Sequence, residues 1–291
     1  PAEKAGVHTG DKILKIDDKE SLSLAVDQAV KLIRGKKGTA VKLTISREGR
    51  KDSLEISIIR DVISIPTADY ELRKDGVYVI RLYNFSATSF TKFREALKDF
   101  VESGTDKLVL DLRNNPGGYL EAAVDMASWF LAPGKVVVRE DSGEATKEKT
   151  HRSNGYNLFN DKLKMIVLVN GGSASASEIL AGALRDHGKA RVVGEKTFGK
   201  GSVQELISVG DKTSIKVTIA RWLTPNGISI SKEGIKPDLE IKMTAEEYVK
   251  GGDIQLEKAV EILRKEGATS STAWILNTPQ FTVTPITVRS E

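Results

Sequence analysis

The sequence contains no cysteine among its 291 residues and only three histidines. Without cysteine, the chain can form neither a disulfide nor a thiolate metal site. His8, His151 and His187 are widely separated along the chain, which argues against a metal site built from histidines. We therefore expect neither a metal ion nor a cofactor. A cysteine-free chain is compatible with an oxidising compartment and with a reducing one.

The sequence also lacks a strong charge of one sign and a long apolar run. Its 44 Lys+Arg and 40 Asp+Glu are interspersed and give a formal net charge of +4, so it does not indicate a nucleic-acid partner. The sequence contains no run of 18 apolar residues, and so it does not indicate a membrane-spanning segment. The chain opens at Pro1 with neither an initiator Met nor a signal-peptide pattern. We therefore expect that targeting information has been trimmed from its start.

The length of the chain favours two domains, and the pattern of elements changes near residue 65. Before that point, apolar periodicity predicts strands over residues 11–17, 39–47 and 54–60, with an amphipathic helix over 25–35. These elements indicate a small mixed module.

After residue 65, strand patterns alternate with helix patterns. Strands are expected over 76–85, 107–113, 165–170 and 190–194, and helices over 89–104, 119–131 and 177–188, the first with Ser89 as N-cap. This alternation predicts a buried, largely parallel sheet covered by helices.

Further elements are expected towards the C-terminal end. The charged residues 139–152 indicate a loop or hairpin, residues 213–224 a strand, and residues 244–265 one or two helices. The last stretch, 272–291, is apolar and strand-like with two prolines, and suggests an edge strand or a partner contact.

Three alternate serines stand before the third helix, in NGGSASASEIL. Ser175 and Glu178 form S-x-x-E ahead of an apolar run, so the simplest interpretation is a helix-capping box. The same place also suits a nucleophile, because the first amides of the helix present partial positive charge beside the hydroxyl. The residues alone leave both interpretations open.

A nucleophilic serine needs a base. His187 falls on the same predicted helix, about 18 Å from Ser175 at ~1.5 Å per residue, which is too far. A lysine partly shielded from water is the alternative base. Lys200 stands between two glycines in GEKTFGKGSVQ, a loop that would equally suit a solvated lysine.

The segment LDLRNNPGG, residues 110–118, places a Pro-Gly-Gly turn after a buried strand. Backbone N–H groups exposed in such a turn can hold an oxyanion, although an ordinary strand-to-helix turn has the same composition. The glycine patterns of phosphate-binding loops are absent from the sequence.

Taken together and in order, these motifs resemble the carboxy-terminal processing peptidases, also called tail-specific proteases. The resemblance rests on PAEKAGVHTGDKILKIDDKE, LDLRNNPGG, NGGSASASEILAGAL, GEKTFGKGSVQ and GISISKEGIKPD, and spans residues 1 to about 265. It implies an α/β chain, α+β overall, in which a PDZ domain precedes a ClpP/crotonase-like protease core with a Ser/Lys dyad.

The resemblance assigns roles to individual residues. Ser175 corresponds to the nucleophile, Lys200 to the general base and Gln204 to the residue that orients it. Lys200 and Gln204 follow Ser175 by 25 and 29 residues, as they do in the family.

The resemblance also implies an oxyanion hole. The backbone N–H groups of Gly117 and Ala176 would form it, with Gly118 as a substitute for the first. Ser173 and Ser177 are then left with helix-start and packing roles.

The resemblance divides the chain into three parts. Residues 1–62 would be a partial PDZ domain without its first strand and carboxylate-binding loop, which lie upstream of PAEKAG in the family. Residues 63–265 would be the protease core, and residues 266–291 a tail of unassigned role. Peptide capture by this partial domain is left open.

The function expected from the resemblance is that of a serine endopeptidase that cuts proteins near apolar C-termini. An extracytoplasmic location is implied, such as a periplasm, cell envelope or thylakoid lumen, and a homodimer is compatible with the family. Two other functions stay open: a catalytically silent peptide-binding or scaffolding module on the same fold, and a crotonase-like enzyme that acts on acyl thioesters.

Overall fold

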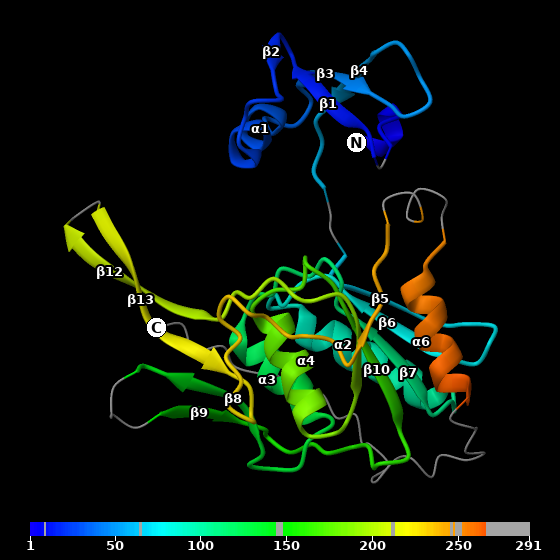
Figure 1. The fold of residues 1–291 in the computed structure, drawn as a ribbon, viewed down its shortest axis with the longest axis vertical. Helices are drawn as coiled ribbons and strands as arrows, with labels where there is room; N and C mark the ends of the chain where they lie inside the picture. Colours follow the sequence, from blue (N-terminus) through cyan, green and yellow to red (C-terminus); the bar gives the residue numbers. More distant parts are fainter. Residues whose placement is uncertain are drawn as a thin grey trace. The chain divides into compact units, whose positions relative to one another are not determined.

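The computed structural model describes residues 1–8, 10–63, 66–143, 148–210, 213–244, 247 and 252–265. The chain folds as two units (Figure 1). Unit 1 contains Pro1–Ile65 and Met243–Asp253, and unit 2 contains Pro66–Lys242 and Ile254–Glu291. Among the helices of the described residues, none has the length and apolar character needed to cross a membrane.

Unit 1 is a four-stranded antiparallel sheet with one helix. After a 3-10 turn at Glu3–Ala5, its elements are β1 (Lys12–Ile16), β2 (Lys19–Glu20), α1 (Val26–Ile33), β3 (Ala40–Ser46) and β4 (Leu54–Ile59), with strand order β2-β1-β3-β4. The strands and the helix expected from the periodicity are thus confirmed. Their inward side chains form a small core of Ile16, Val41, Leu43, Ile45 and Ile58.

An ion pair fastens the start of unit 1 to β3. Arg47 Nε donates to Asp11 Oδ1 and Arg47 Nη2 to Asp11 Oδ2, both at 2.7 Å, and Arg47 Nη2 also donates to the Gly6 carbonyl. The Asp11 side chain is 2% exposed. The hydrogen bond from Arg47 and the one from the His8 N–H lower the pKa of Asp11 to about 2.

Unit 2 is built on a six-stranded sheet in the order β14-β11-β10-β7-β6-β5. Its strands are β5 (Ala68–Leu72), β6 (Tyr78–Leu82), β7 (Lys107–Asp111), β10 (Lys164–Val169), β11 (Arg191–Gly194) and β14 (Leu239–Glu240). All neighbours are parallel except β5, which pairs antiparallel with β6. The expected buried and largely parallel sheet is confirmed, and with it the α/β class.

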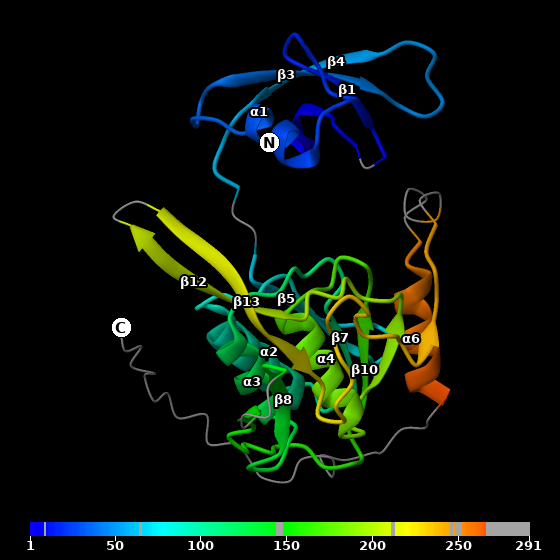
Figure 2. The ribbon, with the colours of Figure 1, turned by 60° about the vertical axis from the view of Figure 1, so that its left-hand side comes forward.

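Helices cover both faces of this sheet (Figure 2). One face carries α2 (Ser89–Glu102), α3 (Leu120–Ser128) and α4 (Ala176–Asp186), and the other carries α6 (Ile254–Lys265). Ser89 is the first residue of α2 rather than its N-cap, which is Thr88. The Ser89 hydroxyl instead donates to the Ser86 carbonyl, so the predicted N-cap was wrong by one residue.

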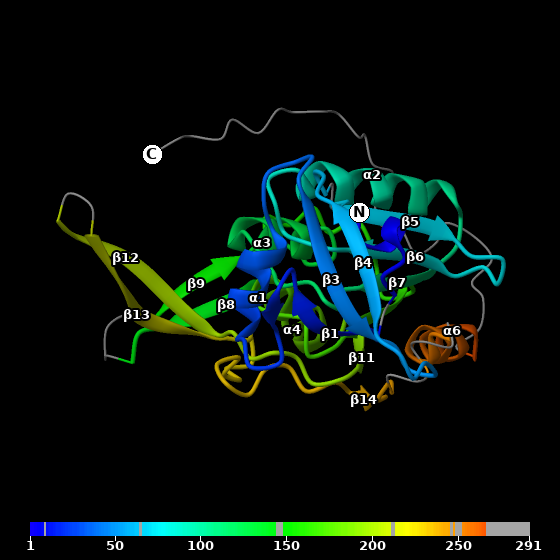
Figure 3. The ribbon, with the colours of Figure 1, turned by 90° about the horizontal axis from the view of Figure 1, so that it is seen from above.

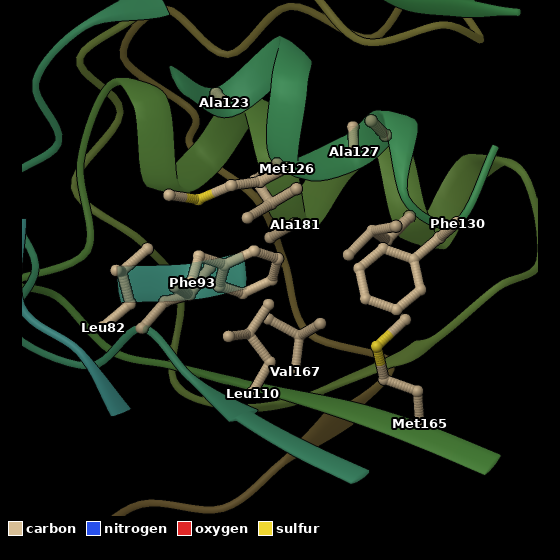
Figure 4. Close-up of a cluster of buried hydrophobic side chains, with 14 of the residues drawn as sticks. Leu82, Phe93, Leu110, Ala123, Met126, Ala127, Phe130, Met165, Val167 and Ala181 are labelled. Atoms are coloured by element: carbon tan, nitrogen blue, oxygen red, sulfur yellow. The ribbon is translucent and has the colours of Figure 1, made fainter. Parts of the chain in front are cut away.

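The larger core lies between the sheet and the three helices (Figure 4). Leu82, Leu110 and Val167 point up from β6, β7 and β10 towards Phe93 of α2 and Met126 of α3. All five side chains are 0–1% exposed. This layer fixes α3 and α4 above the strands, and α4 begins at the serine cluster.

A second sheet of four antiparallel strands has the order β12-β13-β8-β9. Its strands are β8 (Val136–Asp141), β9 (Lys149–Arg152), β12 (Ser202–Gly210) and β13 (Thr213–Leu223). The pair β8–β9 confirms the hairpin expected for the charged segment. The pair β12–β13 extends away from the body of unit 2 (Figure 3).

Two expectations concern the C-terminal region. Of the one or two helices expected over 244–265, α6 covers 254–265. Residues 245–246 and 248–251 lie outside the described residues, and so does the strand-like stretch 272–291.

Replacing Phe93 by Ala should remove a large part of the core above the sheet. We expect the free energy of unfolding of unit 2 to fall by about 3–5 kcal/mol. The measurement is urea denaturation followed by tryptophan fluorescence, which reports on unit 2 because unit 1 contains no tryptophan. Phe198, at 66% exposed, is the matched control, and F198A should change stability by less than about 0.5 kcal/mol.

Asp11→Asn should destabilise unit 1 by about 2 kcal/mol at pH 7. Because the folded pKa of Asp11 is lowered to about 2, the stabilisation is complete above the ordinary carboxyl pKa and disappears as the pH falls through about 2. Urea unfolding followed by circular dichroism should therefore separate the two proteins at pH 7 and not at pH 2. The exposed Asp61 pairs with Lys37, and D61N should have little effect at either pH. An undiminished D11N effect at pH 2 would contradict this account.

Candidate active site

Four chain segments meet at one edge of the large sheet. Strands β11, β10, β7 and β6 are neighbours and run parallel, so the residues that follow them leave the sheet on the same side. These residues are 195–200, 170–175, 112–118 and 83–85. They include the serine cluster, the lysine loop and the Pro-Gly-Gly turn, so the topology brings together the three motifs noted in the sequence.

Two of the three serines are buried and connect neighbouring segments by hydrogen bonds. Ser173 and Ser177 are both 0% exposed. The Ser173 hydroxyl donates to the Leu112 carbonyl at 2.7 Å, and the Ser177 hydroxyl donates to the Asn115 carbonyl at 2.9 Å. Both bonds fasten the start of α4 to the turn after β7, and they leave neither hydroxyl available to a substrate.

Ser175 differs from both neighbours. It is only partly buried, and its hydroxyl makes no hydrogen bond to any described residue. Its backbone has φ 57° and ψ −115°, a conformation that is costly for a residue with a Cβ. Of the two hydrogen bonds of the predicted capping box, one is present: the Ser175 N–H donates to Glu178 Oε2 at 2.8 Å. The hydroxyl itself does not cap the helix.

The Pro-Gly-Gly turn lies directly against this serine. A Cβ built on Gly117 would stand 2.8 Å from Ser175 Cβ and 2.9 Å from the Ala176 nitrogen, so only glycine allows this approach. Gly117 also has φ 92°. The turn and the nucleophile candidate therefore share one small space.

Three backbone amides, those of Gly117, Gly118 and Ala176, belong to the two segments that meet there. The Gly117 N–H donates to Asn115 Oδ1 at 2.9 Å. Among the described residues, the N–H groups of Gly118 and Ala176 have no hydrogen-bond acceptor. The fully buried Asn115 holds the turn, since its Nδ2 donates to the Leu82 carbonyl at 2.7 Å and its carbonyl accepts from the Ala174 N–H at 3.0 Å.

The glycines beside Lys200 allow a close approach of backbones. A Cβ on Gly199 would meet the Lys232 backbone at 2.9 Å, and one on Gly201 would meet the Ser231 nitrogen at 2.2 Å. The loop is also tied to the serine segment, because the Phe198 N–H donates to the Ser173 carbonyl at 3.0 Å.

The side chains of Lys200 and Gln204 are both exposed. The Lys200 N–H donates to Glu178 Oε2 at 3.0 Å, the same oxygen that binds the Ser175 N–H. Within the described part of the chain, no hydrogen bond joins Lys200 Nζ to Ser175 Oγ or to Gln204. Gln204 stands on β12, a strand that we did not predict, and pairs with Thr218.

Neither histidine of unit 2, His151 or His187, lies at this edge. His187 ends α4 at the opposite end from Ser175, and its Nε2 lies 2.7 Å from the Val136 carbonyl. His151 is on β9 beside Glu140. Among the described residues, no three His, Cys, Asp or Glu side chains are grouped to hold a metal ion.

Two buried residues of the site were missed as functional candidates. Asn115 was noted only as part of a turn and Glu178 only as part of a capping box. Glu178 is 0% exposed although it stands in the first turn of a helix. A carboxylate inside an otherwise apolar helix face is the signal that could have identified it.

The comparisons with known proteins support the resemblance. The model of peptidase family S41 matches residues 76–241, and a PDZ-domain model matches residues 1–58. The chain is 41% identical over 260 residues to the carboxy-terminal-processing protease of Bartonella bacilliformis, covering 88% of this chain and 59% of that protein. It is 38% identical over 250 residues to carboxy-terminal processing protease CtpA of Bacillus subtilis, covering 86% and 52%. It therefore spans about half of these relatives' length.

A solved structure is similar as well. The photosystem II D1 C-terminal processing protease matches with a TM-score of 0.65 and 28% identity, over 90% of this chain and 69% of that one. The motif-based resemblance is confirmed by these findings.

The strained backbone of Ser175 predicts that glycine is more stable than alanine at this position, the reverse of the usual order. Ser175→Gly should be about 1 kcal/mol more stable than Ser175→Ala, because only glycine relieves the positive φ. At Ser177, inside α4, the Gly variant should be about 1 kcal/mol less stable than the Ala variant. Urea denaturation followed by tryptophan fluorescence measures both differences. Equal stability of S175G and S175A would contradict a strained nucleophile turn.

Proposed function

The chain belongs to peptidase family S41, and on that basis we propose that it is a serine endopeptidase that cleaves proteins near their C-termini. Ser175 is the nucleophile and Lys200 is the general base. The observation that carries the proposal is the position of Ser175. Its hydroxyl has no partner among the described residues and stands on a strained turn, and the N–H groups of Gly118 and Ala176 have no acceptor there. The Ser175 N–H shares one carboxylate oxygen with the Lys200 N–H of the lysine loop.

The reaction starts when Ser175 Oγ attacks the carbonyl carbon of the scissile peptide bond. Lys200 Nζ, in its neutral form, takes the hydroxyl proton and then passes it to the leaving amine as the C–N bond breaks. Water hydrolyses the acyl-enzyme in the second half-reaction by the same route. Gln204 acts by orienting the lysine. Because Lys200 and Gln204 are exposed, their side chains must turn towards Ser175 for the reaction.

The developing oxyanion is held by backbone amides. The Ala176 N–H is one donor, and the second comes from the Gly117–Gly118 turn. Gly117 can supply it when its N–H leaves Asn115 Oδ1, while the Gly118 N–H is already without an acceptor among the described residues. Both positions need glycine, since a Cβ on Gly118 would stand 2.1 Å from the Phe85 carbonyl oxygen.

The proposed substrates are polypeptides with apolar C-termini. Two exposed aromatic side chains come from the segments that frame Ser175: Tyr119, 59% exposed, directly follows Gly118, and Phe198, 66% exposed, precedes Gly199. Exposed aromatic rings favour contact with an apolar chain. Unit 1, which matches the PDZ model, is the proposed binder of the substrate's C-terminus. The names of the relatives, carboxy-terminal processing proteases, support cleavage near a C-terminus.

Cleavage of an unfolded protein with an apolar C-terminus tests the mechanism. We expect S175A and K200A each to lower kcat by at least about 10³-fold, with thermal stability unchanged for K200A. Lys196, four residues earlier in the same loop and paired with Glu233, is the matched control, and K196A should cleave normally. Normal cleavage by K200A would refute the lysine as base.

A second experiment tests the substrate class and the competing functions. A substrate ending in apolar residues should be cut faster than the same chain with an acidic or amidated C-terminus. Binding of the peptide without any cleavage by the parent would favour the silent binding module, and binding of an acyl-CoA would favour the thioester enzyme.

A further inference from the structure

Glu178 connects the two halves of the proposed dyad from a fully buried position. Its side chain is 0% exposed. Its Oε2 accepts hydrogen bonds from the N–H groups of Ser175 at 2.8 Å and Lys200 at 3.0 Å. Its Oε1 accepts from the Gly199 N–H at 2.7 Å and from the Thr197 hydroxyl at 2.5 Å. One carboxylate thus binds the nucleophile turn and the lysine loop together.

The number of donors suits a carboxylate and no other side chain of this length. An ionised carboxylate offers about four acceptor sites, and here four donors surround it. A glutamine would place an NH₂ group against two of these donors, and would leave them without an acceptor in a buried place. The site therefore specifies glutamate chemically, not only by size.

A capping role accounts for only one of these four hydrogen bonds. A helix N-terminus needs only the bond from the Ser175 N–H, three residues away. The donors of Thr197, Gly199 and Lys200 come from 19 to 22 residues further along the chain. Bonds over that separation do not stabilise the helix end. They fix where the lysine loop lies.

The network extends behind the lysine loop. The Thr197 hydroxyl that donates to Glu178 also accepts from the Ile235 N–H at 2.6 Å. The segment that ends at Ile235 includes Lys232 and Ser231, against which Gly199 and Gly201 pack. The loop is therefore held on one side by this segment and on the other by Glu178.

We infer that Glu178 is a positioning residue of the reaction. It sets the backbone of Ser175 and the backbone of Lys200 at one fixed spacing, so that the flexible lysine side chain needs only to rotate in order to reach the serine hydroxyl. This inference rests on the proposed function, because it assigns Glu178 a role through the Ser175–Lys200 pair. Glu178 itself touches neither substrate nor the transferred proton.

The test compares Glu178→Gln with Asp106→Asn. Asp106 is also a buried carboxylate, 2% exposed and paired with Lys107, but it precedes β7 at the opposite edge of the sheet. Both variants replace a buried carboxylate by an amide of the same shape. We expect E178Q to lower kcat by about 10- to 100-fold with KM unchanged, because small displacements of reacting groups are costly. D106N should keep the kcat of the parent whatever its effect on stability.

Amide hydrogen exchange gives a second readout that does not depend on turnover. In E178Q, residues 173–177 and 197–200 should both exchange faster than in the parent, and in D106N neither segment should change. If E178Q does not fold, Glu178→Asp takes its place: the shorter carboxylate reaches only one of the two segments, so kcat should fall and one segment should exchange faster.

The outcomes separate this inference from the proposed function. If the parent cleaves in a Ser175-dependent way and E178Q keeps the parental kcat, Glu178 is not a positioning residue while the protease assignment stands. If the parent cleaves nothing, the proposed function fails, and the exchange experiment alone decides whether Glu178 holds the two segments. Unchanged exchange in both segments would overturn the inference in either case.

Discussion

The site depends on one constraint, which is the parallel pairing of β11, β10, β7 and β6. In a parallel sheet all strands end at the same edge, and the register here aligns Leu168 with Asp111 and Val169 with Gly194. The chain therefore leaves four adjacent strands within a narrow strip of the surface. The serine turn, the Pro-Gly-Gly turn and the lysine loop meet there although Ser175 follows Gly118 by 57 residues and Lys200 follows Ser175 by 25. The apolar layer beneath α3 and α4 keeps these segments together, because those helices pack on the same strands.

Holding Ser175 in a strained conformation requires stronger support than helix propensity provides. That support is a set of buried polar groups, Ser173, Asn115, Ser177 and Glu178, each fully buried and each hydrogen-bonded to backbone. A buried polar group without a partner would cost stability, so such a set is stable only when it is complete. Because every group in the set has a hydrogen-bond partner, the serine turn and the neighbouring loops form one cooperative unit. Such a unit can keep a residue at an unfavourable φ.

Periodicity in the sequence predicted most of the elements of both units, because their inward faces are apolar. It did not predict β12, where apolar and polar residues do not alternate regularly, whereas its paired strand β13 alternates at Ile215, Val217 and Ile219 and was predicted. Ser175 and Lys200 could be proposed as the dyad from motifs, since they stand in short, recognisable sequence surroundings. The functions of Asn115 and Glu178 could not, because their partners are backbone amides and carbonyls of distant segments, which any sequence would offer. Only the fold reveals which of those groups converge.

The backbone of the site and its reactive side chains are under different constraints. The amides of Ser175, Gly199 and Lys200 are fixed by Glu178, whereas the Ser175 hydroxyl has no partner in the described residues and the Lys200 side chain is exposed. A lysine has a flexible four-carbon stem. A fixed backbone therefore limits the range of positions that its amine can occupy, but does not hold the amine at one of them. In the proposed mechanism Lys200 takes the proton of Ser175, and a bound substrate that excludes water from the lysine amine would favour this transfer. A substrate chain lying over Tyr119 and Phe198 would exclude that water. In the proposed mechanism the substrate thus completes the assembly of the base, while Glu178 already fixes the backbones of Ser175 and Lys200.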